Sequence, residues 1–296
     1  MTDTTTSRTG TPVLTAATIA QMVEWAVPQI ARNLRPDVLA GLKAARACET
    51  HPRAQAVLDQ LLANARIAAA DEVPLCQDTG YVWVELEVGS DCTVPGNIFS
   101  EVDAAVARAY HGAQLRLSML RDALLDRSNT NNNTPAFTQL TFREKPGATL
   151  HVMLKGGGSD NASRVVMLPP GAGLAGVKQT VLDAVREKAP NACPPLLVGV
   201  GVGGNFDKVS SLAKHALLRE VGSANPDKQL DAIERELLAS INATGIGPGG
   251  LGGHSTALAV HLQTAPCHIA ALPVAVNLGC SALRSLSIAL DAGRRR

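Results

Sequence analysis

The sequence has few aromatic residues and almost no excess of charge of either sign. Only 4 Phe, 2 Trp and 2 Tyr occur in 296 residues, which leaves few rings on which nucleic-acid bases could stack. The 27 Lys and Arg residues nearly balance the 26 Asp and Glu residues, giving a net charge of +1. A nucleic-acid-binding protein normally carries a concentrated basic excess. We therefore expect no nucleic-acid partner.

Long hydrophobic runs are also lacking. No apolar stretch reaches the roughly 20 residues that are needed to cross a bilayer. The first residues, 1–7, are polar and lack the apolar core of a secretory signal. These features predict no membrane association and a cytoplasmic location.

The 6 cysteines form no Cys-x-x-Cys pair, which argues against a zinc finger or ribbon. They also lack the tight spacing of a ferredoxin cluster. A chain without secretory features favours free thiols over disulfides. Any metal site must therefore be assembled from distant segments. The cysteines are Cys48, Cys76, Cys92, Cys193, Cys267 and Cys280.

Hydrophobic residues make up 46% of the chain, enough for a sizeable core. Apolar spacing between residues 15 and 70 predicts a helical N-terminal region, and the later segments alternate between strand-like and helix-like patterns. We therefore predict an α+β fold, a helical N-terminal region followed by mixed β-sheets surrounded by helices. The expected strands are 81–88, 137–142, 149–154, 195–201, 257–262 and 269–278, and the expected later helices are 100–120, 174–188, 207–218 and 227–242.

No internal repeat or low-complexity linker divides the chain. The sequence predicts a mobile tail over residues 1–14, a single domain over 15–290 and a solvated basic tail over 291–296.

Glycine and polar residues concentrate together in several segments, where the backbone can approach a ligand closely and point N–H groups at anions. None of them has the Walker or Rossmann spacing, and no serine-hydrolase elbow occurs. Nucleotide binding is therefore disfavoured. The segments are 76–80, 129–135, 155–161, 199–205 and 245–254.

Three cysteines, Cys76, Cys193 and Cys280, lie in unusual contexts shaped by neighbouring glycines or prolines. Any one of them alone is readily explained as a buried core thiol. Together they indicate a shared site. We interpret the other cysteines, Cys48, Cys92 and Cys267, as structural.

A series of ordered motifs carries a resemblance to a known family. They are Cys-Gln-Asp-Thr-Gly at 76–80, Asn-Thr-x-x-Asn-Thr-Pro-Ala at 129–136, Lys-Gly-Gly-Gly-Ser at 155–159, Asn-Ala-Cys-Pro-Pro at 191–195, Gly-Val-Gly-Val-Gly-Gly at 199–204, Gly-Ile-Gly-Pro-x-Gly-Leu-Gly-Gly at 245–253 and His-Ile-Ala-x-Leu-Pro-Val-Ala-Val-Asn-x-x-Cys at 268–280. Over residues 15–290 the chain resembles the α subunit of iron–sulfur hydro-lyases, the family of class I fumarate hydratase and L(+)-tartrate dehydratase.

The resemblance implies a [4Fe-4S] cluster held by Cys76, Cys193 and Cys280. Three thiolates would leave one iron open as a Lewis acid, as a catalytic metal requires. The implied reaction is the reversible addition of water to a small dicarboxylate, from fumarate to L-malate. The predicted domain over 15–290 is then the catalytic α domain.

The resemblance also assigns roles to other residues. Asp78 is the candidate acid/base or base-orienting group, and His268 matches the family's active-site histidine. Arg116 matches a carboxylate-binding arginine, and Gln77 and Gly157 are candidate donors to the substrate. Lys155, Asn161 and His254 are expected around the site.

The sequence departs from the family after the third cysteine, where Ser-Ala-Leu-Arg-Ser at 281–285 keeps only the arginine of the usual pattern. Asn131 and Asn132 replace the usual Gly-Asp or Gly-Ser. The Pro-Val-Ala-Val-Asn run at 273–277 favours the fumarate type. Three alternatives stay open, namely an L(+)-tartrate dehydratase α subunit, a non-catalytic iron–sulfur sensor and a metal-free binding protein.

Few cations are available for a dicarboxylate, because only Arg116, with Lys155 and Arg284 as weaker candidates, can be nominated. Burying a dianion needs several charge-assisted hydrogen bonds. The chain stops at residue 296, soon after the third cysteine. We therefore expect a separate β subunit to complete the site, and the resemblance implies an α2β2 assembly.

Overall fold

The computed structural model describes residues 14–290, so the tails expected at both ends lie almost wholly outside the described residues. Leu14, the last residue of the expected N-terminal tail, is buried and donates its N–H to Thr93 O at 3.1 Å. The chain divides into two compact units. Unit 1 takes residues up to 28, 82–153 and from 286 onward, and unit 2 takes 29–81 and 154–285. Each unit combines separated segments, so no linker marks the boundary. The prediction of a single domain stays a prediction.

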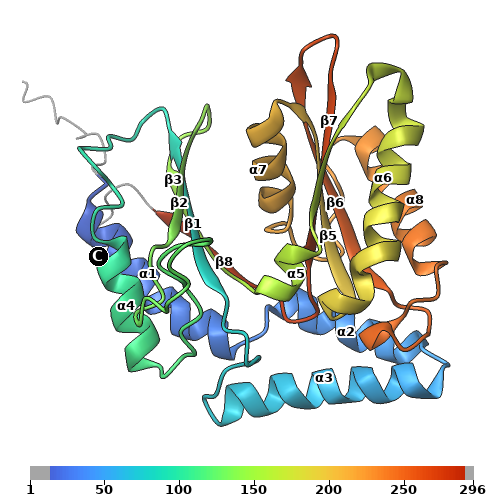
Figure 1. Cartoon of the computed structure of the whole chain (residues 1–296), viewed down its shortest axis with the longest axis horizontal. Coiled ribbons are helices and arrows are strands. Elements are labelled where there is room, and N and C mark those ends of the chain that lie inside the picture. The colour runs from blue at the N-terminus through green and yellow to red at the C-terminus, as the bar shows by residue number, and fades with distance from the viewer. Residues whose placement is uncertain (1–13, 291–296) are drawn as a thin grey trace, which may run out of the picture. The chain divides into compact units, whose positions relative to one another are not determined.

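Unit 1 contains a four-stranded sheet with strand order β2-β1-β3-β8, in which β1 and β2 are parallel. Helices α1 and α4 lie on one side of this sheet (Figure 1). The elements wholly or mostly in this unit are α1 (Ala16–Arg32), β1 (Tyr81–Gly89), α4 (Val102–Gly112), β2 (Phe137–Arg143), β3 (Ala148–Lys155) and β8 (Arg284–Leu290).

Helix α4 is shorter than the sequence predicts. It ends at Gly112 rather than near residue 120, because Gln114 takes a left-handed φ of +53° and Leu115 N–H turns back to Tyr110 O at 2.9 Å. This is the usual way in which a helix closes its last carbonyl groups.

Unit 2 contains the second four-stranded sheet, with strand order β4-β7-β5-β6. Strand β5 is parallel to β6, and β7 is antiparallel to both β4 and β5. Helix α7 covers one face of the sheet, and α6 and α8 cover the other (Figure 1). The elements are α2 (Pro36–Cys48), α3 (Pro52–Ala70), α5 (Gly157–Asn161), β4 (Arg164–Leu168), α6 (Gly173–Lys188), β5 (Leu196–Gly204), α7 (Phe206–Ala216), α8 (Lys228–Asn242), β6 (Ala257–Cys267) and β7 (Leu272–Gly279), with the short 3₁₀ turns η1 (Pro170–Ala172), η2 (Ala189–Ala192) and η3 (Pro248–Gly250).

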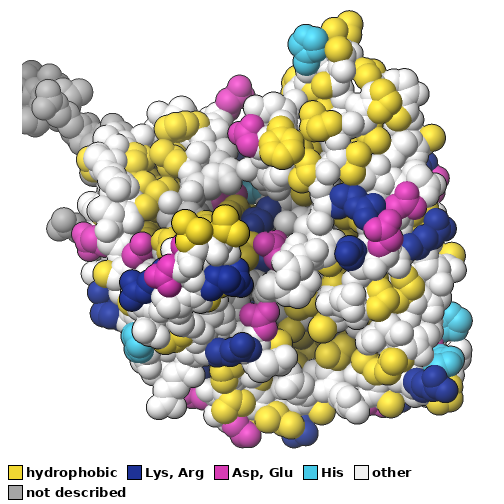
Figure 2. Space-filling model, viewed as in Figure 1, with side chains coloured by type: hydrophobic (Ala, Val, Ile, Leu, Met, Phe, Trp, Pro, Cys, Tyr) yellow, Lys and Arg dark blue, Asp and Glu magenta, His cyan; other side chains and the backbone are white. Residues whose placement is uncertain are grey.

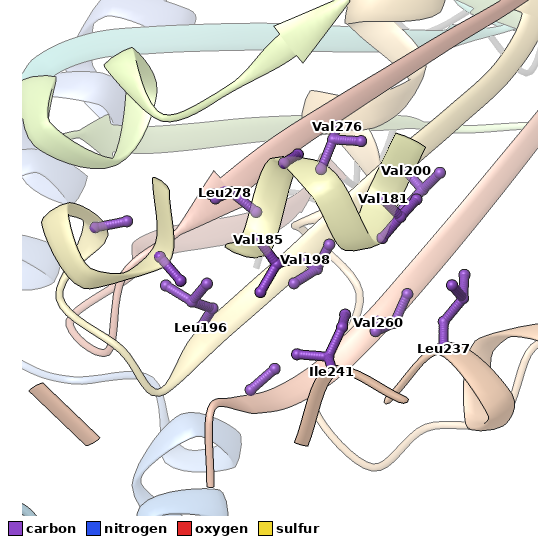
Figure 3. Packing of buried hydrophobic residues seen from close by; sticks show 14 of the residues in the cluster. Val181, Val185, Leu196, Val198, Val200, Leu237, Ile241, Val260, Val276 and Leu278 are labelled. Atoms are coloured by element: carbon purple, nitrogen blue, oxygen red, sulfur yellow. The ribbon is translucent and has the colours of Figure 1, made fainter. Parts of the chain in front are cut away.

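The core of unit 2 lies between the sheet and helices α6 and α8. Aliphatic side chains from all three interdigitate there (Figure 3). Burying each Val, Leu or Ile side chain stabilises the fold by about 1.5–3 kcal/mol relative to its exposure. The labelled members are Val181, Val185, Leu196, Val198, Val200, Leu237, Ile241, Val260, Val276 and Leu278.

The glycine-rich run at 199–204 lies within β5 rather than in a loop. A methyl group on Gly199 would lie 2.1 Å from Ala213 O, and one on Gly201 would lie 2.3 Å from Val209 O. Both carbonyl groups belong to α7. These glycines therefore let α7 pack directly on the strand backbone, a role in helix packing rather than in ligand binding.

The two mixed sheets with surrounding helices confirm the predicted α+β class. All six expected strands are present, with β6 extending five residues beyond its expected end and β7 beginning three residues late. The short strands β4 and β8 were not predicted. None of the helices in residues 14–290 combines the length and hydrophobicity that a membrane span requires.

Candidate active site

The cysteines Cys76, Cys193 and Cys280 all lie in unit 2, each in the connection that follows or precedes a regular element. Cys76 lies between α3 and β1, Cys193 follows η2, and Cys280 follows β7. All three thiols are free. Ser281 N–H donates to Cys193 O at 3.0 Å, which joins two of the three loops.

The thiol groups influence one another electrostatically. Burial raises the pKa of the Cys193 thiol above its usual value, and the negative charges of Cys280, Cys76 and Asp78 raise it further. Charge interactions weaken with distance and are largely screened beyond about 10 Å, so this influence indicates that the four groups lie near one another.

The glycine-rich segment 245–254 braces the Cys193 loop. Gly249 N–H donates to Pro194 O at 2.8 Å, directly after Cys193. The segment is in turn fixed by Glu49, a buried residue whose carboxylate accepts His254 N–H at 2.8 Å and the N–H groups of Thr50 and His51 at 3.0 Å each. Burial opposes ionisation of Glu49, but these three backbone donors hold its pKa below the usual value.

Asp78 is fixed by two backbone amides. Its Oδ1 accepts Gly80 N–H at 3.0 Å, and its Oδ2 accepts Gly157 N–H at 2.8 Å. The carboxylate is partly exposed, two residues after Cys76. Gly157, which was expected to donate to substrate, therefore donates to Asp78 in this arrangement. Gln77 is exposed, and its Oε1 accepts the Cys76 thiol at 3.4 Å.

A buried ionic network lies next to these residues. Lys155 is fully buried, and its Nζ donates to Ser159 Oγ at 2.9 Å and to Leu278 O at 2.8 Å. Asp160 Oδ1 lies 3.4 Å from the same Nζ. Burial lowers the pKa of Lys155 to about 8, although Asp160 and Cys280 act in the opposite direction. A lysine that remains charged this deep in the fold depends on those partners.

The network continues through Tyr81. Its hydroxyl donates to Asp160 Oδ2 at 2.9 Å and accepts from Lys214 Nζ at 2.7 Å. Burial raises the pKa of Tyr81 well above its usual value, and Asp160 adds to the effect. Sequence reasoning missed Tyr81, Asp160, Lys214 and Glu49. The one available signal was that Tyr81, one of only 2 tyrosines, follows the motif at 76–80.

His268 is not placed beside the cysteines of its own chain. It lies exposed in the connection between β6 and β7, where its Nδ1 accepts Ala270 N–H at 3.1 Å. Cys280 follows the opposite end of β7, which spans Leu272–Gly279 and therefore separates the two by roughly 25 Å. Hydrophobic side chains cover the outer end of this hairpin (Figure 2), where Ile269 is 92% exposed.

Arg116 lies in unit 1, exposed, four residues after the end of α4. The asparagine-rich motif at 129–136 fixes the segment that follows it. Asn133 is fully buried and its Oδ1 accepts Ser118 N–H at 2.8 Å, and Asn129 Nδ2 donates to Leu117 O at 2.9 Å. The motif therefore shapes the backbone beside Arg116.

The remaining residues named from the sequence have the following contacts and positions. The Cys92 thiol contacts Asp91 Oδ1 at 3.5 Å, and the exposed Cys267 thiol donates to Ala271 O at 3.2 Å. Cys48 is exposed at the end of α2, Asn161 ends α5, and His254 Nε2 lies 3.0 Å from Thr50 Oγ1.

Hydrogen bonds thus link the loops that carry three free thiols, a carboxylate held by two amides and a buried lysine. Thiolates are groups that can bind a metal. The chain belongs to the fumarate hydratase (Fumerase) family, whose family model matches residues 20–289. This confirms the resemblance drawn from the motifs.

Individual relatives agree with the family. The chain is 37% identical over 257 residues to a protein of Methanocaldococcus jannaschii whose name assigns it provisionally as an L(+)-tartrate dehydratase subunit alpha, covering 85% of this chain and 90% of that protein. It is 33% identical over 259 residues to the L(+)-tartrate dehydratase subunit alpha of Escherichia coli K12, covering 86% of this chain and 85% of that protein. The family and both relatives are named for hydration or dehydration, so this is a family of hydro-lyases.

Proposed function

We propose that this chain is the α subunit of an iron–sulfur hydro-lyase that reversibly hydrates fumarate to L-malate. The proposal is supported by the electrostatic influence of Cys76, Cys280 and Asp78 on Cys193, by the hydrogen bond that joins the Cys193 and Cys280 loops, and by the two amides that fix the Asp78 carboxylate. The cytoplasm is the proposed location.

The donor set fits a [4Fe-4S] cluster. Three thiols on three separate loops match the preference of iron–sulfur clusters for thiolate ligands, and two of the loops are tied together by the Ser281–Cys193 hydrogen bond. When bound, such a cluster supplies a Lewis acid that assists departure or addition of the substrate hydroxyl group.

Asp78 is the proposed acid/base group. Its two amide donors fix both carboxylate oxygens in position, and each oxygen keeps a further lone pair with which it can accept a proton from the substrate carbon. Gln77, exposed beside Cys76, is the proposed donor to a substrate carboxylate. We propose Arg116 as the cation for the other carboxylate, since guanidinium binds carboxylates in bidentate fashion.

His268 can take its proposed role only if it enters the active site of another copy of the chain. Roughly 25 Å of strand β7 separate it from Cys280 in the same chain, too far for a shared substrate of four carbons. This requirement agrees with the proposed α2β2 assembly, and a β subunit is proposed because both relatives are named as α subunits.

L(+)-tartrate is the second candidate substrate. It is favoured by the names of the two relatives, whereas the run at 273–277 favours fumarate. Both substrates are small dicarboxylates, so the same site residues serve either reaction.

The test is an anaerobic assay of the cluster-loaded chain, co-purified with its β subunit, on fumarate, L-malate and L-tartrate. We expect interconversion of fumarate and L-malate, and no activity from the α chain alone. Turnover of L-tartrate only would replace the substrate, and the absence of turnover on all three by a cluster-loaded complex would contradict the proposed hydro-lyase activity.

A further inference from the structure

Arg284 is a buried arginine whose guanidinium group is only partly satisfied by the residues that the structure describes. It is the first residue of β8, four residues after Cys280, and only 1% of it is exposed. Its Nε and Nη1 are buried with no hydrogen-bond partner in the part of the chain that the structure describes. The turn before it is closed by Leu283 N–H, which donates to Cys280 O at 3.0 Å.

Two other arginines of unit 2, Arg35 and Arg219, pair with carboxylates, although the Nε of Arg219 is also buried without a partner among the described residues. Arg35 donates to Asp37, Ser285 and two backbone carbonyl groups, and Arg219 pairs with Glu234. Lys155 is likewise provided for by Ser159, Leu278 O and Asp160. By contrast, two of the three guanidinium nitrogens of Arg284, Nε and Nη1, have no hydrogen-bonded partner among the described residues.

The guanidinium faces the catalytic carboxylate across Gly156. A methyl group built on Gly156 would lie 3.0 Å from Asp78 Oδ2 and 3.7 Å from Arg284 Nη2. The carboxylate and the guanidinium therefore approach the same point of the backbone, and the carboxylate lies close enough that a side chain at 156 would crowd it. The two side chains therefore share one corner of the three-thiol site.

Burying an unpaired guanidinium is costly, because the charge loses its hydration and gains no hydrogen bond in return. Such a group is tolerated where negative charge lies close by. Three thiolates with their bound cluster, together with Asp78, provide that charge. Because Nε and Nη1 are shielded from solvent, these two donors face the protein interior, and there Arg284 acts through its charge.

We infer that Arg284 is a positioning residue of the three-thiol centre: its buried guanidinium balances the negative charge of a cluster bound by Cys76, Cys193 and Cys280 and holds the Asp78 carboxylate in its corner beside Gly156. The inference rests on the proposed function and adds to it a residue that tunes the bound cluster.

The test is an anaerobic redox titration of the full chain reconstituted with iron and sulfide, followed by electron paramagnetic resonance. The variants are Arg284→Met, which removes the charge, and Arg284→Lys, which keeps it. Arg164→Met is the matched control, because Arg164 is a more exposed arginine of unit 2 that pairs with Glu187. Circular dichroism checks folding, and if Arg284→Met does not fold, Arg284→Gln replaces it.

Reduction adds a negative charge to the cluster, so loss of the nearby positive charge should disfavour the reduced form. We expect the midpoint potential of Arg284→Met to fall by at least 59 mV, a tenfold change in the one-electron equilibrium. Arg284→Lys should recover most of this shift, and Arg164→Met should show none. If Arg284→Met has the same midpoint potential as the parent, the inferred role of Arg284 is overturned while the proposed function stands. A parent chain that binds no cluster overturns the proposed function, and the inference with it.

Discussion

The N–H of Gly157 donates to Oδ2 of Asp78 at 2.8 Å, across 79 residues of sequence. This bond joins two of the family motifs, at 76–80 and at 155–159, and with Gly80 N–H it fixes both oxygens of the carboxylate. A general base works best when its orientation is already set before substrate arrives. The relationship therefore explains why an aspartate stands at this position.

Asp78→Asn should keep the cluster and lose about 10²- to 10⁴-fold in kcat, the usual contribution of an acid/base group. Asn has one carbonyl oxygen, so it can satisfy only one of the two amide donors, and a modest loss of stability should accompany the loss of turnover. Steady-state kinetics and iron content are measured on the same preparation. Asp71→Asn, an exposed residue after α3, is the control. Turnover within twofold of the parent would limit Asp78 to a structural role.

Glu49→Gln should weaken the Cys193 loop from a distance. The Glu49 carboxylate accepts three backbone N–H groups, including that of His254, which is 205 residues away. A single amide oxygen cannot replace both carboxylate oxygens, so we expect a loss of about 1–3 kcal/mol in the free energy of unfolding. Denaturant unfolding measures this, with the exposed Glu72→Gln as the control. An unchanged midpoint would show that Glu49 does not brace the segment at 245–254.

Acid should destabilise the chain through His261. Burial, together with the nearby positive charge of Arg219, lowers the pKa of this histidine from its ordinary value of 6.5 to about 4. As the pH falls from about 6.5 to about 4, the unfolded chain binds a proton that the folded chain does not, so stability decreases through this window. The loss is at most about 3 kcal/mol.

The measurement compares metal-free parent and His261→Asn by urea unfolding at pH 7.5 and pH 5. Asn preserves a donor for Ala216 O, the carbonyl that His261 Nδ1 contacts at 3.2 Å, but it does not titrate. The parent should lose more stability between the two pH values than the variant. Equal losses would contradict the assigned pKa direction.

Local pattern in the sequence was sufficient for most of the fold. The predicted strand at 81–88 is β1 and the predicted helix at 174–188 is α6, because both have clear periodicity and a buried face. Strand β4 was missed because it has only five residues and its sequence, Arg-Val-Val-Met-Leu, does not alternate polar and apolar residues, although its burial does alternate. The glycines at 199–204 were grouped with segments that approach a ligand, because their packing against α7 depends on an element that follows them in sequence.

The site was partly predictable for a similar reason. The motifs identify Cys76, Cys193, Cys280 and Asp78, because each lies in a distinctive short context. The network of Lys155, Asp160, Tyr81 and Lys214 depends on contacts between segments up to 133 residues apart, which no local pattern encodes. Nor does sequence show that Arg284 is buried and only partly satisfied by the described residues, or that His268 lies at the far end of β7.

The most direct test of the account is the iron and sulfide content of single Cys→Ser variants reconstituted anaerobically. Serine preserves the shape but replaces a thiolate by a hydroxyl, which is a poor iron ligand at neutral pH. Cys76→Ser, Cys193→Ser and Cys280→Ser should each lose the cluster and its visible absorbance. Cys48→Ser, Cys92→Ser and Cys267→Ser should match the parent. Full iron and sulfide content in any of the first three variants would contradict the three-thiol centre.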